Sequence, residues 1–188
     1  MRGFDRAYSF GFYDGSLRKL IQLFKYYGMK PLGNPLASLL CRALPSEPIE
    51  RHDAAVAMPL HWRRRWSRGF NQSEILARIV AKQRGIAMID GVKRIRATAT
   101  QAGLSHRTRR KNVAGAFRVS RKTKLAGKRI LLIDDVMTTG STAAACASAM
   151  KDAGAASVTL LTVARVDRRF ARFGSAAIKR SASEGNER

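Results

Sequence analysis

Short apolar runs are spaced along the chain between segments of mixed polarity. Runs with the length and composition of buried strands span 54–58, 92–95, 115–119, 130–133 and 157–164. The run at 130–133 is uninterrupted, which is typical of a strand covered on both faces in a parallel sheet. Pro59 directly follows the first run and marks its end. The pattern therefore predicts a mostly parallel sheet of about five strands.

Apolar residues at helical spacing predict helices between these runs. The expected helices begin at four positions, Asp14, Pro35, Asn71 and Ala143. Glycines suited to C-terminal caps follow three of them, at Gly28, Gly85 and Gly154. Because helices alternate with strands, the sequence predicts an α/β fold with a doubly wound sheet.

Two aspartates, Asp134 and Asp135, directly follow the apolar run 130–133. We expect them at the carboxyl end of that strand, the edge where open α/β sheets bind ligands. Their like charge makes them poor phosphate ligands, but a carboxylate accepts strong hydrogen bonds from the vicinal hydroxyls of a ribose. Each such bond is worth about 1.5–3 kcal/mol. The pair is therefore predicted to hold sugar hydroxyls.

A loop of small residues follows, with hydroxyl side chains around one glycine: Thr138, Thr139, Gly140, Ser141 and Thr142. It precedes an Ala-rich helical segment, so we expect it on a helix N-terminus, where an anion gains about 0.3–1 kcal/mol from the helix dipole. Gly140 leaves the backbone open to close approach by a phosphate. The aspartates and the loop together predict a site for ribose 5-phosphate.

The alternative for this segment is purely structural: Asp134 caps a turn, and the Thr/Ser cluster is an ordinary helix cap. Two other phosphate-binding motifs do not match, because the chain has neither G-x-G-x-x-G nor a P-loop ending in Gly-Lys-Ser/Thr. The pattern over 129–142 instead resembles the signature of type I phosphoribosyltransferases, which bind 5-phosphoribosyl 1-diphosphate (PRPP).

Other segments are similar to the ComF/GntX family, a phosphoribosyltransferase-like group named for DNA-uptake competence. They span 68–72 and 100–117, and residues 13–21 with Lys25 and Tyr26 also match. The resemblance covers about residues 5–165. It implies a type I phosphoribosyltransferase fold, with a small helical hood and N-terminal segment over 1–50 and the core over 51–166. The basic, Ser/Gly/Ala-rich composition of residues 167–188 predicts a partly disordered tail.

The resemblance also implies roles for residues. Asp134 and Asp135 would be the catalytic pair that holds the ribose, and residues 138–142 would bind its 5′-phosphate. The segment 98–113 would close over the diphosphate. The candidate cations for the diphosphate are Arg68, Arg107, Arg110 and Lys111. Mg²⁺ would arrive with the substrate and make few or no direct bonds to the protein. The activity implied is phosphoribosyl transfer to an acceptor that the sequence does not identify, or recognition of PRPP alone.

Members of this family commonly begin with a four-cysteine zinc ribbon. This chain has only Cys41 and Cys146, far apart and in no C-x₂-C arrangement, so we expect neither a structural zinc nor a disulfide. His52, His61 and His106 show no ligand spacing either. No run of eighteen apolar residues and no signal-peptide pattern occurs, so a cytoplasmic location is expected.

The charge is strongly basic, with 36 Lys+Arg against 13 Asp+Glu and a formal net charge of +23. Such a surplus attracts polyanions, and single-stranded nucleic acid is a candidate partner. The residues best suited to it interleave arginines with aromatic rings: Trp62, Arg63, Arg64, Arg65 and Trp66. The tryptophans are equally suited to packing on the core. A non-catalytic DNA-uptake protein that binds nucleic acid on a basic surface is therefore the competing hypothesis.

Overall fold

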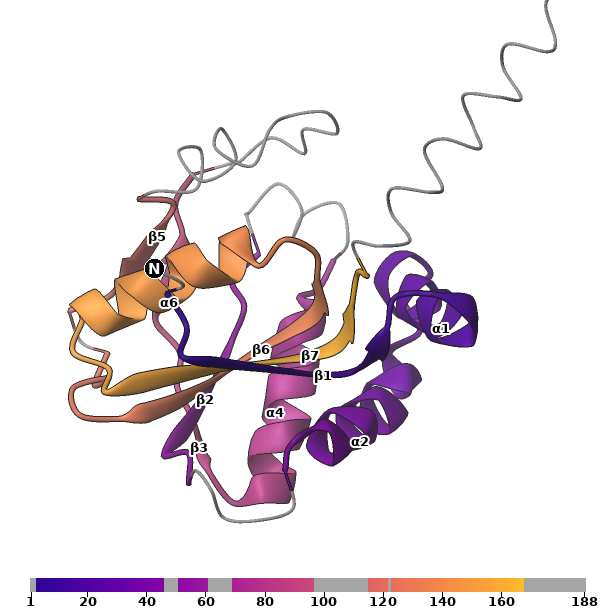
Figure 1. Cartoon of the computed structure of the whole chain (residues 1–188), viewed down its shortest axis with the longest axis horizontal. Helices are drawn as coiled ribbons and strands as arrows, with labels where there is room; N and C mark the ends of the chain where they lie inside the picture. Colours follow the sequence, from indigo (N-terminus) through magenta and orange to yellow (C-terminus); the bar gives the residue numbers. More distant parts are fainter. Residues whose placement is uncertain (1–2, 46–50, 61–68, 97–114, 122, 168–188) are drawn as a thin grey trace, which may run out of the picture.

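Five parallel strands form the central sheet in the computed structural model of the chain (Figure 1). The structure describes residues 3–45, 51–60, 69–96, 115–121 and 123–167. Within these residues the strand order is β1 (Arg6–Phe12), β7 (Ser157–Arg165), β6 (Arg129–Met137), β2 (Ala54–Ala57) and β3 (Ala87–Met88). A separate antiparallel pair joins β4 (Val92–Arg94) to β5 (Phe117–Val119).

Helices cover both faces of the sheet (Figure 1). One face carries α6 (Ser141–Asp152), and the other carries α1 (Gly15–Tyr26), α2 (Gly33–Ala43) and α4 (Gln72–Arg84). A short 3₁₀ turn, Lys30–Leu32, joins α1 to α2. No helix in the described part of the chain is long and apolar enough to cross a membrane.

The central strand β6 explains why both faces must be covered. Its residues 130–133 are fully buried, and their side chains alternate between the two faces. Ile130 and Leu132 belong to the cluster that contains Cys146 and Met150 of α6. Leu131 and Ile133 belong to the opposite cluster, together with apolar residues of α1, α2 and α4. The uninterrupted apolar run is thus the signature of a doubly covered strand.

The predicted α/β fold, with its doubly wound parallel sheet, is confirmed. The structure adds a strand at the N-terminus, because residues 6–12, for which the sequence predicts no strand, form the edge strand β1 of the main sheet. β1 pairs in parallel with β7, from Arg6 opposite Thr159 to Phe12 opposite Arg165. The expected closing segment 98–113 and the tail after Asp167 lie outside the described residues.

Candidate functional site

A cavity of about 370 Å³ opens at the carboxyl end of β6. Both aspartates line it, and so do residues of the small-residue loop, among them Thr138, Gly140 and Thr142. The aspartates lie inside β6 rather than after it, because the strand continues to Met137, where it still pairs with β7. The structure therefore brings the two predicted halves of the site to one cavity.

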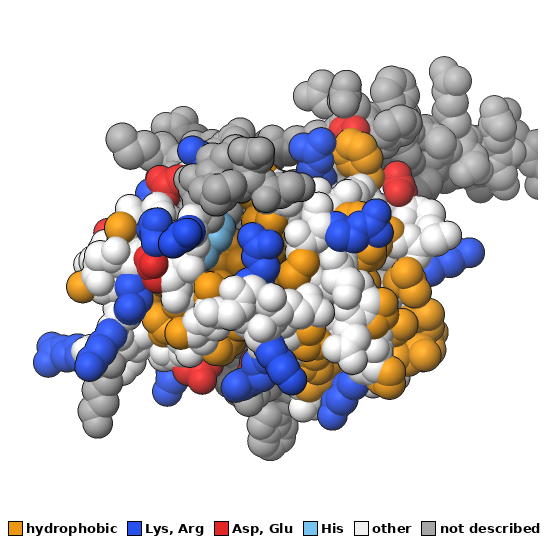
Figure 2. Space-filling model, turned by 90° about the horizontal axis from the view of Figure 1, so that it is seen from below, with side chains coloured by type: hydrophobic (Ala, Val, Ile, Leu, Met, Phe, Trp, Pro, Cys, Tyr) orange, Lys and Arg blue, Asp and Glu red, His pale blue; other side chains and the backbone are white. Residues whose placement is uncertain are grey.

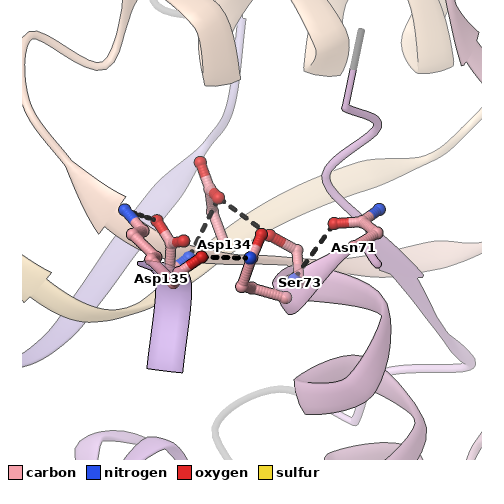
Figure 3. A network of polar contacts seen from close by, with 6 residues as sticks. Asn71, Ser73, Asp134 and Asp135 are labelled. Atoms are coloured by element: carbon pink, nitrogen blue, oxygen red, sulfur yellow. Dashed lines mark hydrogen bonds and ion pairs between the residues drawn. The ribbon is translucent and has the colours of Figure 1, made fainter. Parts of the chain in front are cut away.

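Asp134 is held by the start of α4. Its Oδ1 accepts hydrogen bonds from Ser73 Oγ at 2.9 Å and from the backbone N–H of Asp135 at 2.9 Å (Figure 3). Asn71 caps α4 as predicted, since its side chain accepts from the Ser73 N–H, and its Nδ2 donates to the Met58 carbonyl. The cap therefore fixes Ser73, and Ser73 orients Asp134.

Asp135 is held by a different element. Lys25 of α1 places its Nζ 2.7 Å from Asp135 Oδ1, and the two side chains are only 14% and 11% exposed. Gln72 of α4 is fully buried and donates from its Nε2 to the Lys25 carbonyl oxygen at 3.3 Å. The end of α1 is thus attached both to the acid pair and to α4.

Burial raises the pKa of Asp134 to about 7, and the neighbouring charge of Asp135 acts in the same direction. Lys25 and the hydrogen bonds from the Asp135 N–H and from Ser73 partly oppose this rise in pKa. Two adjacent carboxylates taken out of water resist double ionisation. Near neutral pH Asp134 is therefore partly protonated.

Each carboxylate keeps one oxygen available. Asp134 Oδ2 and Asp135 Oδ2 accept no hydrogen bond from any residue that the structure describes. An ionised carboxylate oxygen is an acceptor only, so the ionised pair offers two acceptors to donors that enter the cavity. Two neighbouring hydroxyl groups of a sugar are donors of this kind.

The small-residue loop turns at Gly140, which has a φ of 75° and precedes the first residue of α6. Thr139 Oγ1 lies 2.9 Å from Ser141 Oγ and accepts from the Ser141 N–H at 3.3 Å. The loop therefore lies on a helix N-terminus as predicted. Backbone N–H groups that point out of the first turn of a helix favour an anionic ligand.

Two cations of this cavity were missed by the sequence analysis, Lys25 and Arg94. Arg94 is on β4, just before the residues outside the described part, and its guanidinium stands over the Phe117 ring at 5.7 Å. The sequence marks Lys25 only as one of the positions, together with Tyr26, that match the ComF/GntX pattern. Nothing in the apolar pattern marks either residue as part of the site.

The other predicted site residues lie outside the described residues. They are the diphosphate candidates Arg68, Arg107, Arg110 and Lys111, and the nucleic-acid candidates Trp62, Arg63, Arg64, Arg65 and Trp66. Nor do three His, Cys, Asp or Glu side chains gather anywhere in the part that is described. Two carboxylates beside an ammonium group favour hydroxyl ligands.

The chain is similar to known proteins over most of its length. The phosphoribosyl transferase domain matches residues 67–173, a range that includes the acid pair and the loop. The DNA utilization protein YhgH of Salmonella typhimurium is 36% identical over 166 residues, which cover 86% of this chain and 72% of the relative. Competence protein F of Haemophilus influenzae is 32% identical over 167 residues, which cover 86% and 73%.

The matches among solved structures are more distant in sequence. The glutamine phosphoribosylpyrophosphate (PRPP) amidotransferase from B. subtilis matches with a TM-score of 0.49 and 19% identity, over 74% of this chain and 30% of that enzyme. The orotate phosphoribosyltransferase from Aeropyrum pernix matches with a TM-score of 0.45 and 15% identity, over 79% and 80%.

Proposed function

Since this chain belongs to the phosphoribosyl transferase domain family, and within it to the ComF proteins, we propose that it binds PRPP and transfers its phosphoribosyl group. The observation that carries this proposal is the pair of open carboxylate oxygens on Asp134 and Asp135, which line one cavity with a loop on a helix N-terminus. This combination matches a sugar that carries vicinal hydroxyls at one end and a phosphate at the other.

In this proposal the ribose 2′- and 3′-hydroxyls donate to Asp134 and Asp135, and residues 138–142 hold the 5′-phosphate. An Mg²⁺ ion bound to the substrate would neutralise charge on the diphosphate. Arg94 lines the same cavity and is a candidate to stabilise the departing diphosphate, together with Arg68, Arg107, Arg110 and Lys111. Fixed cations and hydrogen-bond donors act without reorganising when charge develops, so they lower the barrier.

Transfer is tested by measuring diphosphate release from PRPP with Mg²⁺ across a panel of nucleobases and amines. We expect release with at least one acceptor, and loss of that release in the Asp134→Asn, Asp135→Asn double variant. The exposed Asp152→Asn on α6 is the control and should keep the wild-type rate. PRPP binding without release for any acceptor would contradict transfer and leave recognition of PRPP as the function.

The second candidate is binding of single-stranded nucleic acid. The names of the two relatives, a DNA utilization protein and a competence protein, favour it, and so does the net charge of +23. In Figure 2 basic side chains are spread over the visible face and acidic ones are few. Exposed aromatic rings accompany them at the end of α1, where Tyr27 is 76% exposed. On β1, Phe10 and Phe12 lie under Arg42 and Arg165 at 5.6 Å and 4.9 Å.

This candidate is tested by the salt dependence of single-stranded DNA binding, because log K should fall with log salt by about 0.7 per phosphate neutralised. Trp66→Ala and Tyr27→Ala should each lose about 1–3 kcal/mol if a base stacks on the ring, and Met29→Ala is the exposed, non-aromatic control. Changing Arg63, Arg64 and Arg65 to Gln should flatten the slope. Undetectable binding near physiological salt would exclude this function.

A further inference from the structure

A lysine that is far from the acid pair in the sequence contacts it in the folded protein. Lys25 lies in the last turn of α1, and its Nζ lies 2.7 Å from Asp135 Oδ1 inside the cavity. The other two basic residues of the same helix, Arg18 and Lys19, are exposed. Lys25 is therefore the lysine of α1 that the fold directs inward.

Two features fix this lysine in place. Both side chains of the ion pair are largely buried, and a buried charge is tolerated only when a partner compensates it. The backbone of Lys25 is also anchored, because the buried Gln72 donates to its carbonyl oxygen. Gln72 is followed directly by Ser73, which holds Asp134. One turn of α4 thus aligns both the lysine and the first carboxylate.

We propose that Lys25 is a positioning residue for sugar recognition, because it holds one oxygen of Asp135 so that the other faces the ligand, and because it supplies the positive charge that two adjacent carboxylates need. The inference rests on the proposed function of the same cavity and deepens it. A pair balanced in this way accepts the two hydroxyls of a ribose without a divalent cation between them. Mg²⁺ is then required only by the diphosphate of PRPP.

The test separates the sugar from the diphosphate by using ribose 5-phosphate, titrated by calorimetry in MgCl₂ and again in EDTA. The wild-type protein should bind it with the same affinity in both. Lys25→Met removes the charge but keeps the length of the side chain, and should weaken binding in EDTA by about tenfold or more. Mg²⁺ should restore part of the lost affinity, because it supplies the missing positive charge.

Two further variants distinguish the charge from the packing of the side chain. Lys25→Arg keeps the charge and should stay within about threefold of wild type, a change of less than about 1 kcal/mol. Lys19→Met is the matched control on the exposed side of α1 and should change nothing. Inorganic phosphate binds only the loop, so its affinity should be equal in all four proteins. If Lys25→Met fails to fold, Lys25→Gln takes its place, since an amide still donates to Asp135 but carries no charge.

Each outcome decides a separate point. Equal ribose 5-phosphate affinity of the wild type and Lys25→Met in EDTA would overturn the role of Lys25 while leaving the proposed function intact. A loss in Lys25→Met that Mg²⁺ does not reduce and Lys25→Arg does not rescue would also overturn it, since this is the result of a purely structural role. A wild-type protein that binds phosphate but not ribose 5-phosphate would contradict the proposed function itself.

Discussion

The acid pair and the small-residue loop line one cavity, yet the chain builds them by different means. Asp134 and Asp135 receive their partners from α4 and α1, and the bond from Ser73 to Asp134 joins residues 61 positions apart. The loop is held in part by its own side chains, through Thr139 and Ser141, which are two positions apart. One half of the site depends on the whole fold, and the other half depends on a local turn.

The two halves are therefore sensitive to different substitutions. A local turn fails when its own backbone is changed, because its shape requires particular backbone dihedral angles. A buried pair of carboxylates fails when any of its distant partners is removed, because each partner compensates part of the cost of burial.

The largest effect is expected from Gly140→Val in the loop. Gly140 has a φ of 75°, a region that β-branched residues avoid, so the turn must change shape. Binding of inorganic phosphate, measured by calorimetry, should weaken by about 100-fold or more. The strained backbone should separately lower the stability of the fold by about 1–3 kcal/mol. Gly127→Val is the control, since Gly127 has a φ of 70° in a turn away from the cavity. Equal loss in both variants would remove the phosphate role of the loop.

The acid pair should give the next largest effect, and only on the sugar. We expect the Asp134→Asn, Asp135→Asn double variant to bind ribose 5-phosphate about tenfold or more weakly, which is about 1.4 kcal/mol. Its affinity for inorganic phosphate should be unchanged, because the loop is built independently. An equal loss of affinity for ribose 5-phosphate and for inorganic phosphate would show that the acid pair and the loop depend on each other.

Stability should depend on pH through Asp134. Its pKa is raised to about 7, chiefly by burial, so the folded chain keeps a proton that the unfolded chain releases above about pH 4. The stability that this group contributes is present at low pH and is lost as the pH rises through about 7. The free energy of unfolding should therefore fall more steeply in wild type than in Asp134→Asn between about pH 4 and pH 7. The free energy of unfolding is measured by denaturant titration at a series of pH values. The same dependence on pH in the two proteins would contradict the raised pKa.

The smallest effect is expected from Ser73→Ala. The variant removes one hydrogen bond to Asp134 but leaves the Ser73 N–H and its Asn71 cap in place. Ribose 5-phosphate affinity should fall by about threefold, consistent with about 0.5–1.5 kcal/mol for one such bond. Ser38→Ala on α2 removes a hydroxyl that bonds only to an exposed carbonyl and should not affect binding. An unchanged Ser73→Ala affinity would mean that α4 does not orient the carboxylate.

The same division explains how much of the fold could be predicted. The apolar run of β6 and the caps of α4 at Asn71 and Gly85 are local signals, and the structure confirms them. β1 was missed because its burial is partial, as expected for an edge strand, so its apolar residues follow no buried pattern. Its pairing with β7 depends on contacts across almost the whole chain.

The candidate site follows the same rule. Asp134, Asp135 and the loop are neighbours in the sequence, so their chemistry was visible as one motif. Lys25 and Arg94 come from α1 and β4 and meet the motif only after folding. The pattern of apolar and polar residues does not show which of the many basic side chains will point into the cavity after folding.

The pairing of β1 with β7 also sets an order of events during protein synthesis. Ser9 of β1 bonds to Thr162 of β7, which is 153 positions later. At ordinary translation rates β1 therefore leaves the ribosome roughly 10 to 30 s before its partner strand exists. α1 must wait as well, because its buried residues Ile21 and Phe24 belong to the same core cluster as Leu161 and Val163 of β7. A nascent chain that ends before Ser157 already contains the acid pair and the loop. It lacks the strand with which β1 pairs and part of the face on which α1 packs, so Lys25 cannot yet be placed beside Asp135.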